Sequence, residues 1–134
     1  MLRLNPEQLV FVTERHLATL TTLRADGSPH VTPVAFMWDA ATGTAVMTTE
    51  RDSAKAVNAR RRGPDGRAPR AALCQVVGGR WLTIEGTIEA VDDGATVADA
   101  VARHARRYYP LEPDEARIVL RLTADRVLAS DYMA

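Results

Sequence analysis

The sequence predicts a mainly β fold in which about six antiparallel strands form a small Greek-key barrel with helices at its side. Three observations lead to this prediction. Residues 80–91 alternate between polar and apolar side chains, which is the pattern of a strand that buries one face. The dipeptide Asp26-Gly27 favours a tight hairpin turn between two other strands. The remaining predicted strands are joined by short turns, and closing such a sheet into a barrel removes its open edges.

The length and composition of the chain indicate a single domain that spans residues 1–134. Its 46% hydrophobic and 25% charged residues are typical of a soluble globular protein. The net charge of zero excludes a general basic field that recruits nucleic acid or an anionic membrane. The single cysteine excludes an intramolecular disulfide. We find neither an apolar run of about 20 residues nor a signal segment, so we expect a cytoplasmic protein.

The N-terminal residues predict a helix over 5–15. Asn5 is a favourable cap, Pro6 suits the first helical position and Gln8 completes a capping box. Three strands are expected after this helix, and the second of them contains Pro33. Because proline donates no backbone hydrogen bond, Pro33 predicts a sheet edge or a bulge. Such an edge either receives a planar ligand or is a plain edge strand. The three predicted strands are 17–23, 30–38 and 44–49.

The second half of the chain predicts further strands and a longer helix. Within 80–91, the even-numbered residues Leu82–Ile88 form the expected core face. Trp81 then lies on the less buried face, beside Arg80 and Gln75. A tryptophan in that position is either a stacking or interface residue, or a partly covered residue at the end of the sheet. The predicted elements are strands 71–77, 80–91 and 118–123, a helix over 94–109 and a final segment 126–132.

The stretch Thr48–Arg61, TTERDSAKAVNARR, carries the most distinctive local pattern. It predicts the end of a strand, a charged turn and a short helix that begins at Asp52 or Ser53, both good N-cap residues. Lys55 then lies in the first helical turn, where the helix dipole favours anions over cations. A bound phosphate reverses this argument, because the Ser53 hydroxyl, Lys55 and Arg51 then converge on one anion. A solvated surface lysine is the alternative.

The segment 60–70, RRRGPDGRAPR, is predicted to be a loop because it contains two glycines and two prolines. Its five arginines allow a role in binding phosphate or nucleic acid. Against this, no aromatic residues for base stacking are interleaved with the arginines, and the rest of the chain is not basic. A solvated loop is therefore the favoured interpretation on these residues alone.

The usual signatures of enzymatic chemistry are absent from the sequence. The histidines, His16, His30 and His104, have no metal-ligand spacing, and no nucleotide-binding or nucleophile motif occurs. Cys74 lies in the middle of an apolar strand, where cysteines are usually inert. If the protein is an enzyme, we therefore expect a bound cofactor to carry the chemistry.

Three segments carry a resemblance to a known family: HLATLTTLRADGSPHVTPVAF, TTERDSAKAVN and LCQVVGGRWLTIEGTIEAV. In this order, along nearly the whole chain, they resemble the pyridoxamine-phosphate-oxidase-like superfamily, whose fold is the six-stranded FMN-binding split barrel. Within it, the chain is most similar to small reductases that use the deazaflavin coenzyme F420, and among them to biliverdin reductases. The pattern S-x-K-A-x-N is the most specific part. The loop 60–70 looks longer than in those reductases.

The resemblance implies a homodimer with two cofactor grooves at the subunit interface. The strand at residues 30–36 is expected beside the deazaflavin ring, the end of the third strand at the ring or ribityl chain, and the following helix at the phosphate. Residues of the second subunit are expected to complete each groove. The implied cofactor-binding residues are Thr32, Pro33, Val34, Thr48, Thr49, Ser53, Lys55 and Asn58, with Gln75, Arg80 and Trp81 from the partner side. Arg51 and Arg61 are the expected substrate-binding residues.

The implied reaction is hydride transfer from C5 of reduced F420 to a planar conjugated acceptor of the tetrapyrrole or quinone type. In the most similar reductases this acceptor is biliverdin, which becomes bilirubin. Two alternatives remain open: an FMN flavoprotein of the pyridoxamine phosphate oxidase type, and a non-catalytic protein that binds F420 or a haem-like ligand. A nucleic-acid-binding barrel is disfavoured by the neutral charge and by the aromatic content of 5%.

Overall fold

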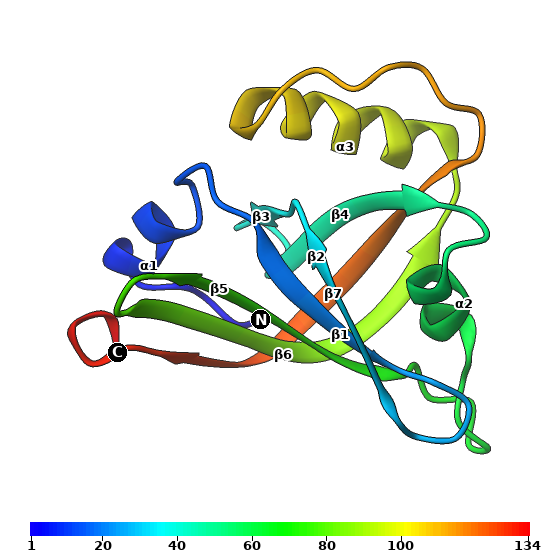
Figure 1. The fold of residues 1–134 in the computed structure, drawn as a ribbon, viewed down its shortest axis with the longest axis horizontal. Coiled ribbons are helices and arrows are strands. Elements are labelled where there is room, and N and C mark those ends of the chain that lie inside the picture. Colours follow the sequence, from blue (N-terminus) through cyan, green and yellow to red (C-terminus); the bar gives the residue numbers. More distant parts are fainter.

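The computed structural model describes residues 1–134 and contains one antiparallel sheet of seven strands in the order β2-β1-β5-β6-β7-β4-β3 (Figure 1). The strands are β1 Ala18–Leu23, β2 Pro29–Val34, β3 Met37–Asp39, β4 Thr44–Glu50, β5 Arg70–Val77, β6 Arg80–Val91 and β7 Arg117–Ala129. The helices are α1 Pro6–Phe11, α2 Ala54–Arg60 and α3 Gly94–Arg107, and a short 3-10 helix covers Asp131–Met133. The prediction of a mainly β fold with flanking helices is confirmed.

The expected strand 30–38 is divided into β2 and β3, which is why the sheet has seven strands instead of six. β2 pairs with β1 and β3 pairs with β4, so that the two pieces lie at opposite ends of the strand order. The backbone of Phe36, between them, bonds to side chains instead of a strand. Its carbonyl accepts from the Arg107 guanidinium and from the Tyr108 hydroxyl at 3.3 Å. These contacts hold the chain where it leaves one edge and joins the other.

The sheet is split because its edges are not hydrogen-bonded to each other. β2 pairs only with β1, and its outer edge is free. β3 covers β4 only as far as Val46, so the remainder of β4, from Met47 to Glu50, pairs with β7 on one side and with no strand on the other. The two free edges approach the link Ala35–Phe36 from either side, and they define the split of the barrel.

Strand β7 joins two segments that the sequence analysis treated separately, 118–123 and 126–132. It runs continuously because a bulge absorbs Asp125: Glu85 pairs with Arg126 while Gly86 pairs with Ala124. At this point the strands approach very closely, and a Cβ atom at position 86 would lie 1.9 Å from the carbonyl oxygen of Thr123. Only glycine is compatible with this bulge.

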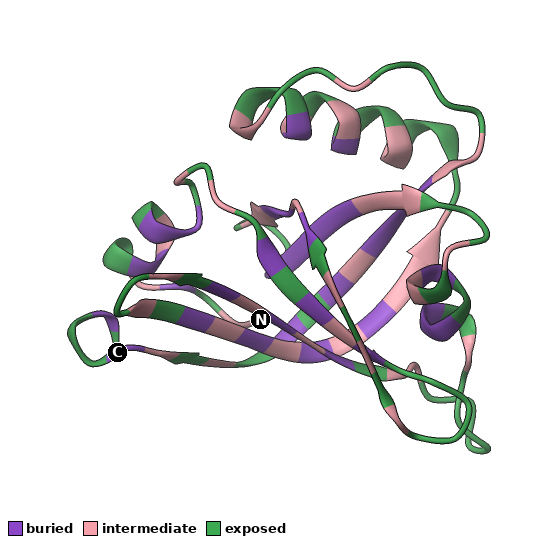
Figure 2. Cartoon of the chain, in the orientation of Figure 1, coloured by how far each residue is buried: buried purple, intermediate pink, exposed green.

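The predicted alternation of β6 is confirmed. Its residues Leu82, Ile84 and Ile88 are almost completely buried, whereas Trp81 at its start is 37% exposed. Figure 2 shows buried and less buried positions alternating along β6. The buried set belongs to a hydrophobic cluster of 21 residues that includes Phe11 of α1. One face of the sheet therefore forms the core, and the opposite face remains accessible along β5 and β6.

Helix α1 is shorter than the predicted helix over 5–15. The capping box of Asn5 and Gln8 is confirmed, but Val12 already serves as the C-terminal cap. The amide and hydroxyl of Thr13 both donate to the carbonyl of Val10, at 3.1 and 2.7 Å, which tightens the last turn and ends the helix.

Helix α3 begins where the sequence predicts, because the Asp93 side chain accepts a hydrogen bond from the amide of Thr96 at 3.0 Å. It packs over β3, β4 and β7, where its buried Ala100 joins Met37, Val46 and Val119 in a second small cluster (Figure 1). None of the helices has the length and apolar character needed to cross a membrane.

Candidate functional site

The two free edges at the split contain five of the residues expected to bind a cofactor. Thr32, Pro33 and Val34 lie on β2, and Thr48 and Thr49 lie on the uncovered part of β4. Both threonines of β4 are half-buried, and Pro33 is exposed. Unpaired backbone groups at such edges are available to the polar rim of a planar ligand. The sequence-based expectation of a free edge at Pro33 is confirmed.

The end of β4 is connected to the start of α2 through two hydroxyl groups. The Thr49 and Ser53 hydroxyl oxygens lie 2.8 Å apart, and the Ser53 oxygen also accepts from the amide of Ala56 at 3.3 Å. Ser53 is the N-cap, as the sequence predicts. The free edge of β4 therefore leads directly to a helix start that carries Lys55.

Lys55 is a half-buried cation with no hydrogen bond and no ion pair. The first turn of α2 contains no acidic residue that could neutralise it. Nearby, Arg51 uses its guanidinium only to donate to the Glu115 carbonyl at 3.2 Å, and Arg60 donates to the Arg51 carbonyl at 2.8 Å. A cation without an anionic partner at the start of a helix, as Lys55 is, fits a phosphate group.

Two carboxyl groups lie next to this region and interact with each other. A hydrogen bond to Asp114, together with partial burial and charge repulsion, raises the pKa of Glu50. The same hydrogen bond, helped by the amide of Ala116, lowers the pKa of Asp114. Glu50 is therefore easier to protonate than an ordinary glutamate.

Asn58 does not extend into the open part of the site. Its side chain is buried, with the amide nitrogen donating to the Thr22 hydroxyl at 3.0 Å and the amide oxygen accepting from Arg61 at 3.0 Å. Arg61 also donates to the Leu23 carbonyl at 3.1 Å. In this structure the Asn58 amide links α2 to β1, directly through Thr22 and indirectly through Arg61, which also bonds to Leu23.

The expectation that Gln75 lies on the outer face with Trp81 is wrong. The strand register pairs Gln75 with Leu82 on the core face, while the exposed Val76 is the residue opposite Trp81. Gln75 is 1% exposed, donates to the Phe11 carbonyl at 2.8 Å and accepts from Arg107 at 2.8 Å. A polar residue was predicted to be outside, but internal partners satisfy its amide and allow it to be buried.

Arg80 and Trp81 lie at the other end of the sheet from α2, where the β5–β6 turn meets α1 (Figure 1). Arg80 forms an ion pair with Glu14 at 3.0 Å and lies 4.9 Å from the centre of the Phe11 ring. A hydrogen bond from Arg80 lowers the pKa of Glu14. Within one chain, these two residues are therefore not brought together with Lys55.

A basic groove of about 720 Å³ lies between the β1–β2 hairpin and the loop at 61–70. Its lining includes five arginines and no acidic residue. Arg70 is paired with Asp125 and Arg67 with Asp65, but the other three arginines donate only to neutral oxygens. These three unpaired arginines are Arg24, Arg61 and Arg62.

The arginines of the loop stand out in the sequence, whereas Arg24 and His30 do not stand out there as members of a site. Arg24 belongs to a hairpin that is remote in sequence, and only the folded chain brings it to the groove. His30 lies on β2 opposite Thr22, and its Nδ1 is buried without a hydrogen-bond partner. Because His30 lies on the strand that was expected to contact the cofactor, the sequence could have identified it as a candidate site residue. Arg51 does not line the groove, whereas Arg61 does.

Comparison with known proteins agrees with this architecture. The sequence profile of the pyridoxamine 5'-phosphate oxidase family matches residues 4–131. The chain belongs to this family. It is 46% identical over 128 residues to the F420H2-dependent biliverdin reductase of Mycobacterium tuberculosis, a match that covers 96% of this chain and 89% of the reductase.

Several solved structures share the fold. A conserved hypothetical protein of Mycobacterium tuberculosis superposes with a TM-score of 0.77 at 24% identity, covering 98% of this chain and 87% of its own. A protein described as an F420 reductase superposes with a TM-score of 0.69 at 23% identity, covering 91% and 94%. The haem storage protein of Vibrio cholerae gives a TM-score of 0.69 at 18% identity, covering 96% of each chain.

Proposed function

We propose that this protein is an F420-dependent reductase. The observation that carries the proposal is the 46% identity to a reductase that uses F420H2, extended over nearly the whole of both chains. The geometry agrees with it, because the free edges of β2 and β4 and the unneutralised Lys55 suit a flat ring that ends in a phosphate. FMN is the alternative cofactor, and membership of the pyridoxamine 5'-phosphate oxidase family supports it.

The chain's own residues bind and orient the coenzyme in this proposal. The backbone of Thr32–Val34 and the side chains of Thr48 and Thr49 border the ring, and Ser53 and Lys55 bind the phosphate. Bound in its reduced form, F420 supplies the hydride. Holding the donor and acceptor carbons at about 3–3.5 Å accounts for much of the rate enhancement expected from such a site.

The basic groove supports binding of carboxylates next to this site. F420 ends in an acidic tail and biliverdin carries propionates, so both molecules contain groups that pair with arginine. Arg24, Arg61 and Arg62 have no carboxylate partner within the chain and are available for this pairing. Arg51 lies outside the groove, and we assign it as a fourth arginine that pairs with a carboxylate of the ligand.

Biliverdin is the substrate that we propose, and bilirubin the product. The support is the activity named for the mycobacterial relative, together with cations that suit a planar acceptor with two acidic side groups. A quinone-like acceptor is the second substrate class, since it presents the same flat conjugated face.

A homodimer completes the proposal. Residues directly opposite each other in an antiparallel pair share one face of the sheet. The outer face of the sheet therefore carries exposed apolar side chains towards both ends of its strands, and exposed apolar surface favours association. They are Leu23, Val31, Val76, Trp81 and Leu128. Pairing two such faces would bring Arg80 and Trp81 of one subunit toward the coenzyme of the other.

The function is tested by following the absorbance of reduced F420 in the presence and absence of biliverdin. We expect F420 oxidation to depend on biliverdin and to produce bilirubin in a one-to-one ratio. If F420 binds but biliverdin does not promote its oxidation, F420 remains the proposed coenzyme and biliverdin is excluded as the substrate. If the protein is purified with tightly bound FMN, and oxygen reoxidises this FMN during turnover, the flavoprotein alternative is favoured.

A further inference from the structure

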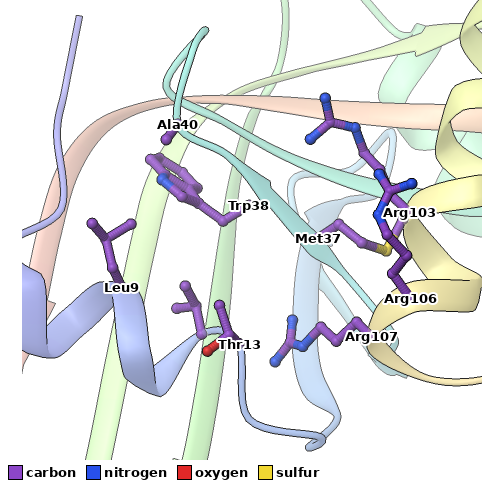
Figure 3. Close-up of a pocket in the computed structure, with 9 residues that line it drawn as sticks. Leu9, Thr13, Met37, Trp38, Ala40, Arg103, Arg106 and Arg107 are labelled. Atoms are coloured by element: carbon purple, nitrogen blue, oxygen red, sulfur yellow. The ribbon is translucent and has the colours of Figure 1, made fainter.

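A second cavity, of about 330 Å³, lies between α1, β3 and the C-terminal half of α3 (Figure 3). None of the residues assigned to the coenzyme or to the basic groove lines it. Its apolar wall is made by Leu9 of α1, by Val12 at the C-terminal cap of this helix, and by Met37 and Trp38 of β3. Its volume lies at the small end of the range typical of ligand pockets, which begins at about 300 Å³.

The opposite wall of the cavity is basic. Three arginines of α3 reach it, and Figure 3 shows their side chains on the side away from Leu9 and Trp38. Arg103 is neutralised by Asp99 at 2.8 Å and lies 3.7 Å from Asp39. The other two arginines, Arg106 and Arg107, have no carboxylate partner.

The two unpaired arginines differ in what their guanidinium groups contact. Arg107 is surrounded by neutral oxygens, since it donates to the carbonyls of Glu14 and Phe36 and to the amide oxygen of Gln75. These bonds satisfy its N–H groups but leave its charge uncompensated. Arg106 is exposed and makes no hydrogen bond. One positive group at the rim is therefore free to bind a ligand, and a second positive charge lies behind it.

The helix dipole alone does not account for this arrangement. Cations at the end of α3 complement the dipole wherever on the helix surface they lie. Here they share one cavity with four apolar side chains, two of which, Val12 and Met37, are 1% and 5% exposed. An apolar floor with a cationic rim suits a molecule that has an apolar body and one acidic group.

We propose that this cavity binds a small anionic amphiphile. Its apolar body lies against Leu9, Met37 and Trp38, and its acid group pairs with Arg106. A cationic molecule is opposed by the uncompensated charges of Arg106 and Arg107, and an uncharged one gains only the apolar contacts. This site is separate from the proposed function, because it uses neither the free strand edges nor Lys55.

The proposal is tested with anilinonaphthalene sulfonate, which has an apolar body and one negative group, and with uncharged anilinonaphthalene as the matched probe. Binding to the full-length protein is measured by fluorescence titration. We expect the sulfonate to bind at least several-fold more tightly than the uncharged probe. Arg106→Glu should weaken sulfonate binding about tenfold, as for the loss of a charge-assisted contact. Arg3→Glu, the same charge change at another exposed arginine, should leave it unchanged.

Two neighbouring alanines locate the bound probe. Ala40 and Ala41 are both exposed in the β3–β4 turn, but only Ala40 lines the cavity. Ala40→Leu should reduce sulfonate affinity several-fold, and Ala41→Leu should not. Equal binding of the two probes, equal effects of the two charge reversals, or equal effects of the two leucines would each overturn the proposal.

Discussion

At the scale of single residues, Lys55 is the most informative side chain. It is the only lysine of the chain, in which all other Lys or Arg positions are arginine. Its side chain is half-buried, and no acidic residue lies in the same helical turn. We expect Lys55→Ala to weaken F420 binding by about 1–3 kcal/mol, the cost of losing a charge-assisted contact to phosphate. Val57→Ala, at an exposed position on the same helix, serves as the control. Fluorescence titration measures both, and an unchanged affinity in Lys55→Ala would remove Lys55 from the phosphate site.

Arg107 has a structural role that can be separated from that of its neighbour. Its guanidinium satisfies the carbonyls of Glu14 and Phe36 and the amide of Gln75. Arg107→Met leaves the buried amide oxygen of Gln75 without a donor and removes one donor from each of the two carbonyls, so we expect a loss of about 2–4 kcal/mol in the free energy of unfolding. The exposed Arg106→Met should change it by less than about 0.5 kcal/mol. Urea denaturation compares the two, and equal midpoints would show that the buried bonds contribute little.

Sequence reasoning worked for residues whose surroundings are local. The Ser53 cap and the Asn5–Gln8 capping box follow from a few consecutive side chains, and both are confirmed. It failed for Gln75, whose face depends on register against β6 and whose burial depends on Arg107, a residue far away in sequence. No pattern within residues 71–77 contains that information.

At the scale of elements, the division of 30–38 into two strands shows the same limit. The residues from His30 to Trp38 have no glycine or charged turn that separates β2 from β3. Arg107 and Tyr108, at the C-terminal end of α3, bond to the Phe36 carbonyl and hold the chain in the break between the strands. The free edge of β2 was predicted because Pro33 is a local signal, but the second free edge, on β4, follows only from the shortness of β3.

Helix α3 holds this break in place, and its start is sensitive to pH. The amide and hydroxyl of Thr96 bond to the carboxylate of Asp93 and lower its pKa below the usual 3.8. The contribution of this cap to stability is therefore complete above that value and is lost as the pH falls through the lowered pKa. Asp93→Asn keeps a capping oxygen but does not titrate.

We expect the melting temperature of the wild type to fall relative to Asp93→Asn between about pH 5 and pH 2. Asp93→Ala should melt at a lower temperature than the wild type at neutral pH, because it removes the cap altogether. Circular dichroism melts over this pH range measure all three proteins. Parallel curves for the wild type and Asp93→Asn would contradict the assigned role of the carboxylate.

At the scale of the whole molecule, the exposed apolar side chains on one sheet face predict the dimer. Val76 lies on that face and is 60% exposed, whereas Val10 on α1 is 63% exposed and lies elsewhere. We expect Val76→Asp to shift the protein to monomers in sedimentation and to weaken F420 binding, because each coenzyme groove needs a second subunit. Val10→Asp should do neither. A Val76→Asp protein that remains dimeric would place the interface on another face.

The mainly β architecture could be predicted because alternation and turn residues are properties of short segments. The resemblance supplied the split barrel and the residues along its free edges. The basic groove could be predicted only in part, since the loop at 61–70 is visible in the sequence but its approach to Arg24 is not. The cavity under α3 could not be predicted from the sequence, because its walls come from α1, β3 and α3, which are far apart along the chain.

Equilibrium titration of the purified protein with F420 and with FMN decides which of the two is its coenzyme. The free strand edges, Ser53, Lys55 and the unpaired arginines of the groove together favour a deazaflavin that has both a phosphate and an acidic tail. We expect F420 to bind more tightly than FMN, which lacks that tail. Preferential binding of FMN would rule out F420 as the coenzyme.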